Sequence, residues 1–250
     1  DMHFAPTQQS ADYLLDEKME KNNVFVAGNT VVDALHYFST LLSSNREKQK
    51  QLQHHFSMLN EDKKLILTTM HRRENFDGGV EEVCKAFIDI ANRGDAEIYF
   101  PVHLNPNVRD TVKSLLGDHP AIHLGDPLDY LQFIYLMNRA HFIISDSGGV
   151  QEEGPSLKKP VLVLREVTER PEGVAANACK LVGTNHQKII NAANQLLDNE
   201  AAYRAMQQGE NLYGDGKASH HITSHILARH GVTNHSEHSE GATAHVTASL

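Results

Sequence analysis

Cysteine is scarce in this chain of 250 residues. The two that occur, Cys84 and Cys179, stand in unrelated contexts, and neither belongs to a CxxC pair. Disulfide frameworks and thiolate metal sites need several cysteines at short, regular spacing. The sequence therefore excludes a disulfide-stapled scaffold, predicts that both thiols are buried structural groups, and favours a reducing cytoplasm as the compartment.

Positive charge is also in short supply. The chain has 23 Lys and Arg residues against 32 Asp and Glu residues, a formal net charge of −9. Surfaces that bind nucleic acid or anionic membranes need positive charge to neutralise phosphate groups. We therefore expect no nucleic-acid partner and no membrane surface. Binding of a small anionic ligand remains possible, because a few arginines and helix N-termini can hold one.

Long apolar runs are absent. No stretch approaches the roughly 18 apolar residues that a membrane-spanning helix needs. The start, Asp1–Pro6, lacks the basic region and apolar core of a signal peptide. Because the first residue is not methionine, we expect the sequence to be a piece of a longer protein.

What is present is an alternation of short apolar runs and amphipathic segments between residues 63 and 197. Val80, Val83, Phe87 and Ile90, for example, follow helical spacing. Continuous apolar strands suit a parallel sheet that is covered on both faces. The pattern predicts an α/β fold with a doubly wound parallel sheet, Rossmann-like, with right-handed crossovers. The predicted strands are Leu65–Thr69, Ile98–Val102, Ala121–Leu124, Phe142–Ser145, Val161–Leu164 and Lys180–Gly183.

The two ends of the chain have a different pattern. Residues 1–62 contain a short strand, Val24–Val26, and helices, and are interpreted as the end of one domain plus an inter-domain segment. Residues 63–212 form the Rossmann-like domain, residues 213–230 a terminal helix, and residues 231–250 a disordered tail without periodicity. Seven of the 17 histidines lie at or after His220, but their spacing matches no metal-ligand set, so no metal is expected.

Polar clusters follow three of the predicted strands, where open parallel sheets bind their ligands. The first cluster, Thr69–Asn75, contains His71, Arg72 and Arg73. Arginines hold phosphate or carboxylate groups through bidentate forks, and histidine transfers protons near neutral pH. The alternative is a solvated basic turn.

The second cluster is Asp146–Glu153. Gly148 and Gly149 open a helix, where free N–H groups can meet an anion, and the Ser147 hydroxyl adds a donor. Glu153 could accept hydrogen bonds from both hydroxyls of a ribose. The alternative is an ordinary glycine-containing turn with acidic residues in the first helical turn.

The third cluster is Arg165–Glu172. Pro171 is well placed to begin a helix, and Arg170 could reach a phosphate. A charged surface loop is an equal alternative. We interpret Tyr213–Gly216 as a turn. Phe133 lies on an apolar helix face, so its default interpretation is a core residue.

Together these segments resemble the bacterial non-hydrolysing UDP-N-acetylglucosamine 2-epimerases. The resemblance covers residues 1–228, with Ala27 and Leu212 departing from the family's usual Thr and Pro. These enzymes have two Rossmann-like domains in a GT-B arrangement, and this chain resembles the second domain with a short end of the first. The matching segments are Gly28–Leu35, Thr69–Asn75, Pro101–Pro106, Asp146–Glu153, Thr168–Glu172 and Tyr213–Gly216.

The resemblance implies a role for each matching residue. Ser147 with its two glycines, Gly148 and Gly149, would hold the diphosphate of UDP, and Glu153 the ribose hydroxyls. Two further UDP contacts are implied, Phe133 near the uracil and Arg170 near the phosphates, and His71 would be the catalytic histidine.

It also implies partners and a reaction. Arg72 and His103 would contact a second, activating UDP-GlcNAc, and the full-length enzyme would be a cytoplasmic homodimer. The reaction interconverts UDP-GlcNAc and UDP-ManNAc through a 2-acetamidoglucal, for bacterial surface polysaccharide, with no cofactor and no metal. Because the first domain's catalytic carboxylates are absent here, this chain alone is not expected to catalyse it.

Three other functions remain open. A GT-B glycosyltransferase domain also binds UDP through a glycine-rich turn and a glutamate, but it has no obvious need for His71 and its arginines. A hydrolysing 2-epimerase, which releases free ManNAc, is disfavoured only by family pattern. A non-catalytic UDP-sensing module would not need His71.

Overall fold

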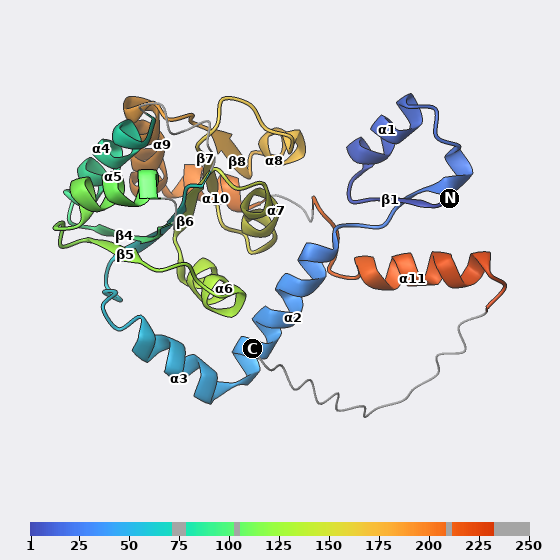
Figure 1. Ribbon diagram of the computed structural model, residues 1–250, viewed down its shortest axis with the longest axis horizontal. Helices are drawn as coiled ribbons and strands as arrows, with labels where there is room; N and C mark the ends of the chain where they lie inside the picture. The colour runs from blue at the N-terminus through green and yellow to red at the C-terminus, as the bar shows by residue number, and fades with distance from the viewer. Residues whose placement is uncertain (72–78, 103–105, 209–211, 233–250) are drawn as a thin grey trace.

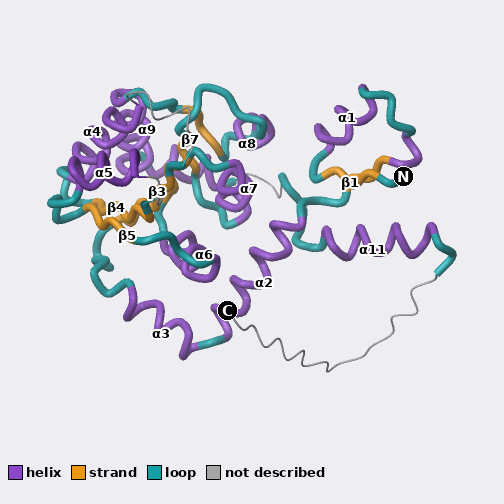
Figure 2. The backbone as a smooth tube through the Cα atoms, in the orientation of Figure 1, coloured by secondary structure: helices purple, strands orange, loops and turns teal. Residues whose placement is uncertain are grey.

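The computed structural model describes residues 1–71, 79–102, 106–208 and 212–232. Within these residues the strands form two separate sheets, one of six strands and one of two (Figures 1 and 2). The strands are β1 (His3–Ala5), β2 (Val24–Val26), β3 (Lys64–Thr69), β4 (Ala96–Pro101), β5 (Ile122–Gly125), β6 (Phe142–Ser145), β7 (Val161–Val163) and β8 (Cys179–Leu181). The helices are α1 (Gln8–Asp16), α2 (Thr30–Ser44), α3 (Arg46–His55), α4 (Gly79–Ala91), α5 (Pro106–Leu116), α6 (Tyr130–Arg139), α7 (Gly148–Ser156), α8 (Pro171–Ala175), α9 (His186–Asp198), α10 (Glu200–Gln207) and α11 (Ala218–Arg229).

The six-stranded sheet has the order β5-β4-β3-β6-β7-β8, and every pair in it is parallel. Numbered within this sheet alone, the order is 3-2-1-4-5-6, that of a dinucleotide-binding Rossmann fold. The predicted doubly wound α/β fold is therefore confirmed. The chain order reverses between β3 and β6, and a crevice at such a switch point is where this fold binds ligands.

Alternate side chains of each central strand enter different apolar layers. On β3, Ile66 faces a layer built with α4, α5, α9 and α10, whereas Leu65 and Leu67 face a layer built with α2, α3, α6 and α7. Because both faces are covered, the strands read in the sequence as continuous apolar runs. Cys84 and Cys179 are buried free thiols, one in each layer, as predicted.

The small lobe consists of β1, α1, β2 and α11 and lies apart from the large body formed by the six-stranded sheet and its helices (Figure 1). Strands β1 and β2 pair in parallel, and the rings of Phe4 and Phe25 stack with centroids 5.6 Å apart. The ring of His225 on α11 lies 4.3 Å from that of Phe25. Helix α2 contacts α11 in the lobe and α6 and α7 in the body, so it joins the two.

Some helices and strands begin or end at other residues than the sequence predicts. The strand predicted at Ile98–Val102 begins two residues earlier, and β1 was not predicted, because three residues carry too little pattern. Of the helices expected within residues 1–62, the last, α3, ends at His55, since Phe56 and Leu59 turn into the core.

Two further predictions concern organisation. The division of the chain at residues 62, 212 and 230 stays a prediction, and all but the first two residues of the predicted tail lie outside the described residues. Among the described residues, no helix combines the length and the apolar character needed to cross a membrane.

Candidate functional site

The ends of β3 and β6 meet at the switch point of the sheet. The hydroxyls of Thr69 and Ser145, the last residues of these strands, lie 2.6 Å apart. The backbone N of Asp146 donates to the carbonyl of Thr69 at 3.3 Å. These bonds bring Thr69, at the start of the first polar cluster, beside the start of the second, as expected for neighbouring parallel strands.

Asp146 and His71 form a dyad at this point. The Asp146 side chain is fully buried, and its two oxygens accept from the backbone N of His71 at 3.2 and 3.0 Å. The Nδ1 atom of His71 lies 3.0 Å from Asp146 Oδ1, while 44% of the His71 side chain is exposed. A carboxylate at Nδ1 favours the tautomer with its proton there, so a neutral ring keeps Nε2 as the basic atom. Sequence analysis gave Asp146 no role.

Helix α7 begins beside this dyad. Ser147 is its N-cap residue, with an extended backbone and no hydrogen bond from its side chain to the helix. The first N–H groups of a helix have no partner within the helix. A Cβ added at Gly148 would meet no described atom within 4 Å, and one at Gly149 would meet only side-chain oxygens at 3.9 Å. The described residues therefore leave space beside these two glycines, at the N-terminus of α7.

The loop after β7 is tied to the start of α7 by a chain of hydrogen bonds. Gln151 Nε2 donates to the carbonyl of Ser147 at 3.2 Å, and its Oε1 accepts from the Thr168 hydroxyl at 2.5 Å. That hydroxyl accepts from the backbone N of Arg170 at 3.0 Å. These bonds hold the backbone of Arg170, the N-cap residue of α8, close to the first turn of α7.

The Arg170 side chain uses two of its five N–H donors within the described structure. Its Nε donates to Glu152, and Nη1 donates to the carbonyl of Glu169 at 3.1 Å. Burial lowers the pKa of Arg170, but the hydrogen bond to Glu152 and its charge outweigh this and raise it overall. Arg170 therefore stays a cation, with donors left for an anion.

Glu153 projects from α7 toward α6. Its buried carboxylate accepts from the Tyr130 hydroxyl at 2.7 Å. Burial raises the pKa of Glu153, the Tyr130 hydroxyl lowers it, and the neighbouring Glu152 raises it again, for a net increase. Burial also raises the pKa of Tyr130, so its hydroxyl remains a donor. Tyr130 was missed in the sequence, where nothing links it to a residue 23 positions away.

Another residue missed in the sequence is Asn29. Its segment crosses Tyr213–Gly216 so closely that a Cβ added at Gly214 would lie 2.9 Å from the Cα of Gly28. Both glycines have positive φ, +86° and +110°, which favours glycine at each position. The backbone N of Asn29 donates to the carbonyl of Tyr213 at 2.7 Å, and its Nδ2 donates to Glu152 at 2.9 Å. The predicted turn thus helps to fix a residue that contacts α7.

The remaining candidates are less well placed. Phe133 is half-buried on α6, one turn beyond Tyr130, and packs against the core layer. Arg72 and His103 lie outside the described residues. No group of three or more His, Cys, Asp or Glu side chains within the described ranges could hold a metal ion.

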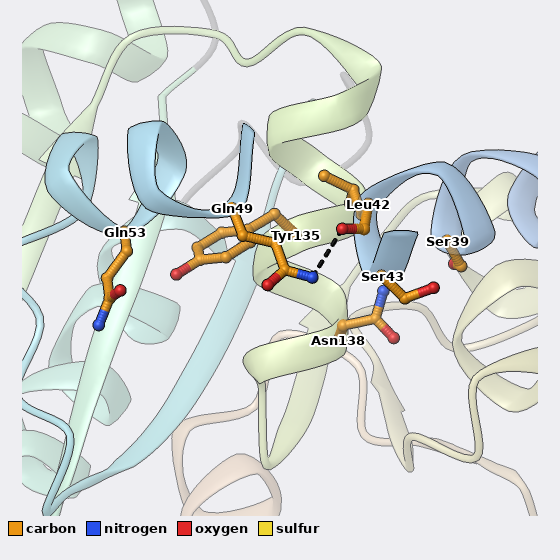
Figure 3. Close-up of a pocket in the computed structure, with 7 residues that line it drawn as sticks. All are labelled: Ser39, Leu42, Ser43, Gln49, Gln53, Tyr135 and Asn138. Atoms are coloured by element: carbon orange, nitrogen blue, oxygen red, sulfur yellow. Dashed lines mark hydrogen bonds between the residues drawn. The ribbon is translucent and has the colours of Figure 1, made fainter. Parts of the chain in front are cut away.

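A separate hollow of about 320 Å³ lies between α2, α3 and α6 (Figure 3). Its lining carries no charged group, so it lacks what a phosphate needs. The lining residues are Ser39, Leu42, Ser43, Gln49, Gln53, Tyr135 and Asn138.

The chain is similar to known proteins over most of its length. The sequence profile of the UDP-N-acetylglucosamine 2-epimerase family matches residues 1–227. The chain belongs to this family. The Yersinia pestis UDP-N-acetylglucosamine 2-epimerase is 47% identical over 232 residues, which are 92% of this chain and 61% of the relative.

Solved structures of the family agree. The Neisseria meningitidis UDP-GlcNAc 2-epimerase bound to UDP-GlcNAc has a TM-score of 0.87 and 44% identity, over 91% of this chain and 61% of that one. A Staphylococcus aureus MnaA–UDP co-structure has a TM-score of 0.84 and 41% identity, over 96% of this chain and 64% of that one. The chain spans about 60% of the length of the curated relatives it matches.

Proposed function

We propose that this chain supplies the UDP-binding half of an enzyme that interconverts UDP-GlcNAc and UDP-ManNAc. One observation carries the proposal. Helix α7 begins at the switch point beside the His71–Asp146 dyad, the backbone of Arg170 is tied to its first turn, and Glu153 lies one turn further along the same helix. The choice of substrate is supported by the relatives, since solved members of the family hold UDP-GlcNAc or UDP.

Each part of the nucleotide has a matching group. The N–H groups of Gly148 and Gly149, the Ser147 hydroxyl and Arg170 offer donors to the diphosphate. Glu153 accepts from the ribose hydroxyls, in the orientation that Tyr130 gives it. Phe133, one turn along the same helix, is proposed to lie near the uracil.

The proposed reaction eliminates UDP and adds it back. A base removes the C2 proton while the bond from C1 to the diphosphate oxygen breaks, which gives 2-acetamidoglucal and UDP. A proton then returns to C2 from the other face as UDP adds to C1. A departing diphosphate is stabilised by fixed donors and cations, which this site provides. His71, oriented by Asp146, either donates to the leaving group as a cation or relays a proton when neutral.

Further parts of the proposal extend beyond this chain. We propose that the full-length enzyme is a cytoplasmic homodimer in which another domain supplies the acid–base carboxylates. A second UDP-GlcNAc would act as an activator at Arg72 and His103, and the UDP-ManNAc product would serve surface polysaccharide synthesis.

Solvent exchange tests the reaction. The full-length protein is incubated with UDP-GlcNAc in D₂O, and deuterium at C2 is followed by NMR. Epimerisation by elimination must place deuterium at C2 of the nucleotide sugar. Consumption of UDP-GlcNAc without deuterium at C2 would instead favour a glycosyltransferase, and release of free ManNAc a hydrolysing epimerase.

A further inference from the structure

Glu152 carries a buried carboxylate whose two oxygens serve different parts of the molecule. The residue is 5% exposed. Its Oε1 accepts from Nε of Arg170, on the loop before α8, and its Oε2 accepts from Nδ2 of Asn29 at 2.9 Å. Because both oxygens are engaged and little of the group reaches solvent, Glu152 is poorly placed to bind a ligand itself.

Asn29 is held firmly at the start of α2, the helix that joins the small lobe to the body. It is the N-cap residue of α2, where its side-chain oxygen accepts from the backbone N of Val31 at 3.1 Å. Its own backbone N is bound to Tyr213. A fixed amide that donates to Oε2 leaves Glu152 one oxygen, Oε1, for the arginine.

A second bond joins the lobe to the same loop. The hydroxyl of Thr7, between β1 and α1, donates to Glu172 Oε1 at 2.6 Å. Glu172 lies two residues after Arg170, in α8, which lies on the side of the large body that faces α1 (Figure 1). The Arg170–Glu172 segment is therefore bound at two points, directly to the small lobe through Thr7 and, through Glu152, to the start of α2, the helix that joins the lobe to the body.

We propose that Glu152 is a positioning residue that aims Arg170 at the diphosphate and makes its position depend on contact with Asn29, at the start of the helix that joins the small lobe to the body. This inference rests on the proposed binding of UDP at α7. A carboxylate close to a phosphate site would otherwise weaken binding through repulsion. Held at Nε, the planar guanidinium presents its Nη donors in one direction.

Asn29 determines whether Glu152 bonds Arg170 through one carboxylate oxygen or through both. With Oε2 occupied by Asn29, the carboxylate bonds Arg170 through one oxygen. Without the Asn29 bond, both oxygens become free to take the guanidinium in a bidentate pair, the geometry that arginine and carboxylate prefer. Such a pair removes donors that the diphosphate needs, so loss of the Asn29 contact would lower affinity for the β-phosphate.

The test compares UDP with UMP, because only UDP carries the second phosphate. Calorimetry on the 250-residue chain is expected to show that wild type prefers UDP. Glu152→Gln should lower UDP affinity by roughly tenfold or more, the effect of a hydrogen bond to a charged group, and leave UMP affinity unchanged. Arg170→Ala should do the same, and the double variant should lose no more than either single variant. Glu166→Gln, the same charge change at an exposed position of this loop, should alter neither affinity.

Asn29→Ser separates the Asn29 contact from folding. Serine keeps the N-cap of α2 and adds no charge, but its side chain is too short to donate to Glu152. It should lower UDP affinity severalfold with UMP affinity unchanged and little change in thermal midpoint, so it tests the inference even if Glu152→Gln does not fold. A wild-type chain without preference for UDP would contradict the proposed diphosphate site itself. A wild type that prefers UDP, with that preference intact in Glu152→Gln or Asn29→Ser, would overturn the role of Glu152 alone.

Discussion

The large body and the small lobe differ in what holds them together. The body buries two apolar layers, one on each face of the six-stranded sheet, with side chains such as Phe87 and Leu35 fully out of solvent. In the lobe the described buried apolar side chains are small, Ala5, Ala11 and Ala218, and the larger Phe4 and Phe25 are only half-buried. Its attachments include single polar bonds, such as that from Thr7 to Glu172 and that from Ala218 to Asp33.

This difference bears on function. The body fixes the backbone of the binding groups, since Ser147 and Asp146 follow directly from a buried strand. The lobe reaches the loop of Arg170 through the hydrogen bond from Thr7 to Glu172, and a bond to a charged group is worth about 1.5–3 kcal/mol net. A bond of that strength can break and re-form as ligands come and go, whereas an apolar layer cannot open without unfolding. A stable body and a lobe held by such bonds suit the proposed function, in which a nucleotide sugar is admitted and released.

A matched pair of core substitutions gives the largest expected contrast. Phe87→Ala, in the body, removes a buried ring whose centroid lies 6.1 Å from that of Phe100. It should lower the free energy of unfolding by about 3–5 kcal/mol. Phe25→Ala, in the lobe, should cost about 1 kcal/mol. Denaturant unfolding measures both. Equal losses at the two positions would contradict the difference drawn between the regions.

Removing His71 should separate chemistry from stability. The side chain is 44% exposed, so His71→Asn should hardly change unfolding. In the full-length enzyme, however, it should lower turnover by roughly 10²–10⁴, with UDP binding much less affected. Steady-state kinetics and calorimetry on one preparation make the comparison. Turnover within a factor of about two of wild type would exclude His71 from the chemical step.

Glu153→Gln should move binding and stability in opposite directions. Loss of the carboxylate should weaken UDP binding by about 1–3 kcal/mol. Because burial raises the pKa of Glu153, its contribution to stability is present below the ordinary value of 4.5 and is lost as pH rises through the folded value. The variant should therefore be at least as stable as wild type at pH 7, with the advantage vanishing toward pH 4. Thermal melts across that range provide the check, and a variant less stable at pH 7 would contradict this sign.

The smallest effect is expected at Asp33, which links α2 to α11. Its carboxylate accepts from the backbone N of Ala218 at 2.9 Å and of Ser219 at 2.7 Å. Burial raises its pKa, but these donors outweigh burial and lower it overall, so this contribution is present at neutral pH and is lost as pH falls below 3.8. Asp33→Ala should cost about 1 kcal/mol, confined to the lobe. Hydrogen exchange should quicken in α11 and not in β3; faster exchange in both would show that the lobe and the body open together.

The sequence predicted local features and missed long-range polar partners. Strands β3 and β6 were predictable because apolar residues on both faces leave a continuous signal. Pro171 marked the start of α8, as its fixed φ suggests. The pairs Asn29–Glu152 and Tyr130–Glu153 were not predictable, because single polar residues carry no periodicity and their partners lie 123 and 23 positions away. Asp146 stood inside a recognised motif, yet only the fold shows that it faces His71.

Gly148→Ala provides the most direct test of the nucleotide site. A Cβ there meets no described atom within 4 Å, and the backbone is not in the left-handed region, so the variant should fold with an unchanged thermal midpoint. If the diphosphate lies against the first turn of α7, the added methyl group occupies its place. Calorimetry should then show UDP affinity reduced by roughly tenfold or more. A Gly148→Ala chain that binds UDP as tightly as wild type would contradict the proposed site.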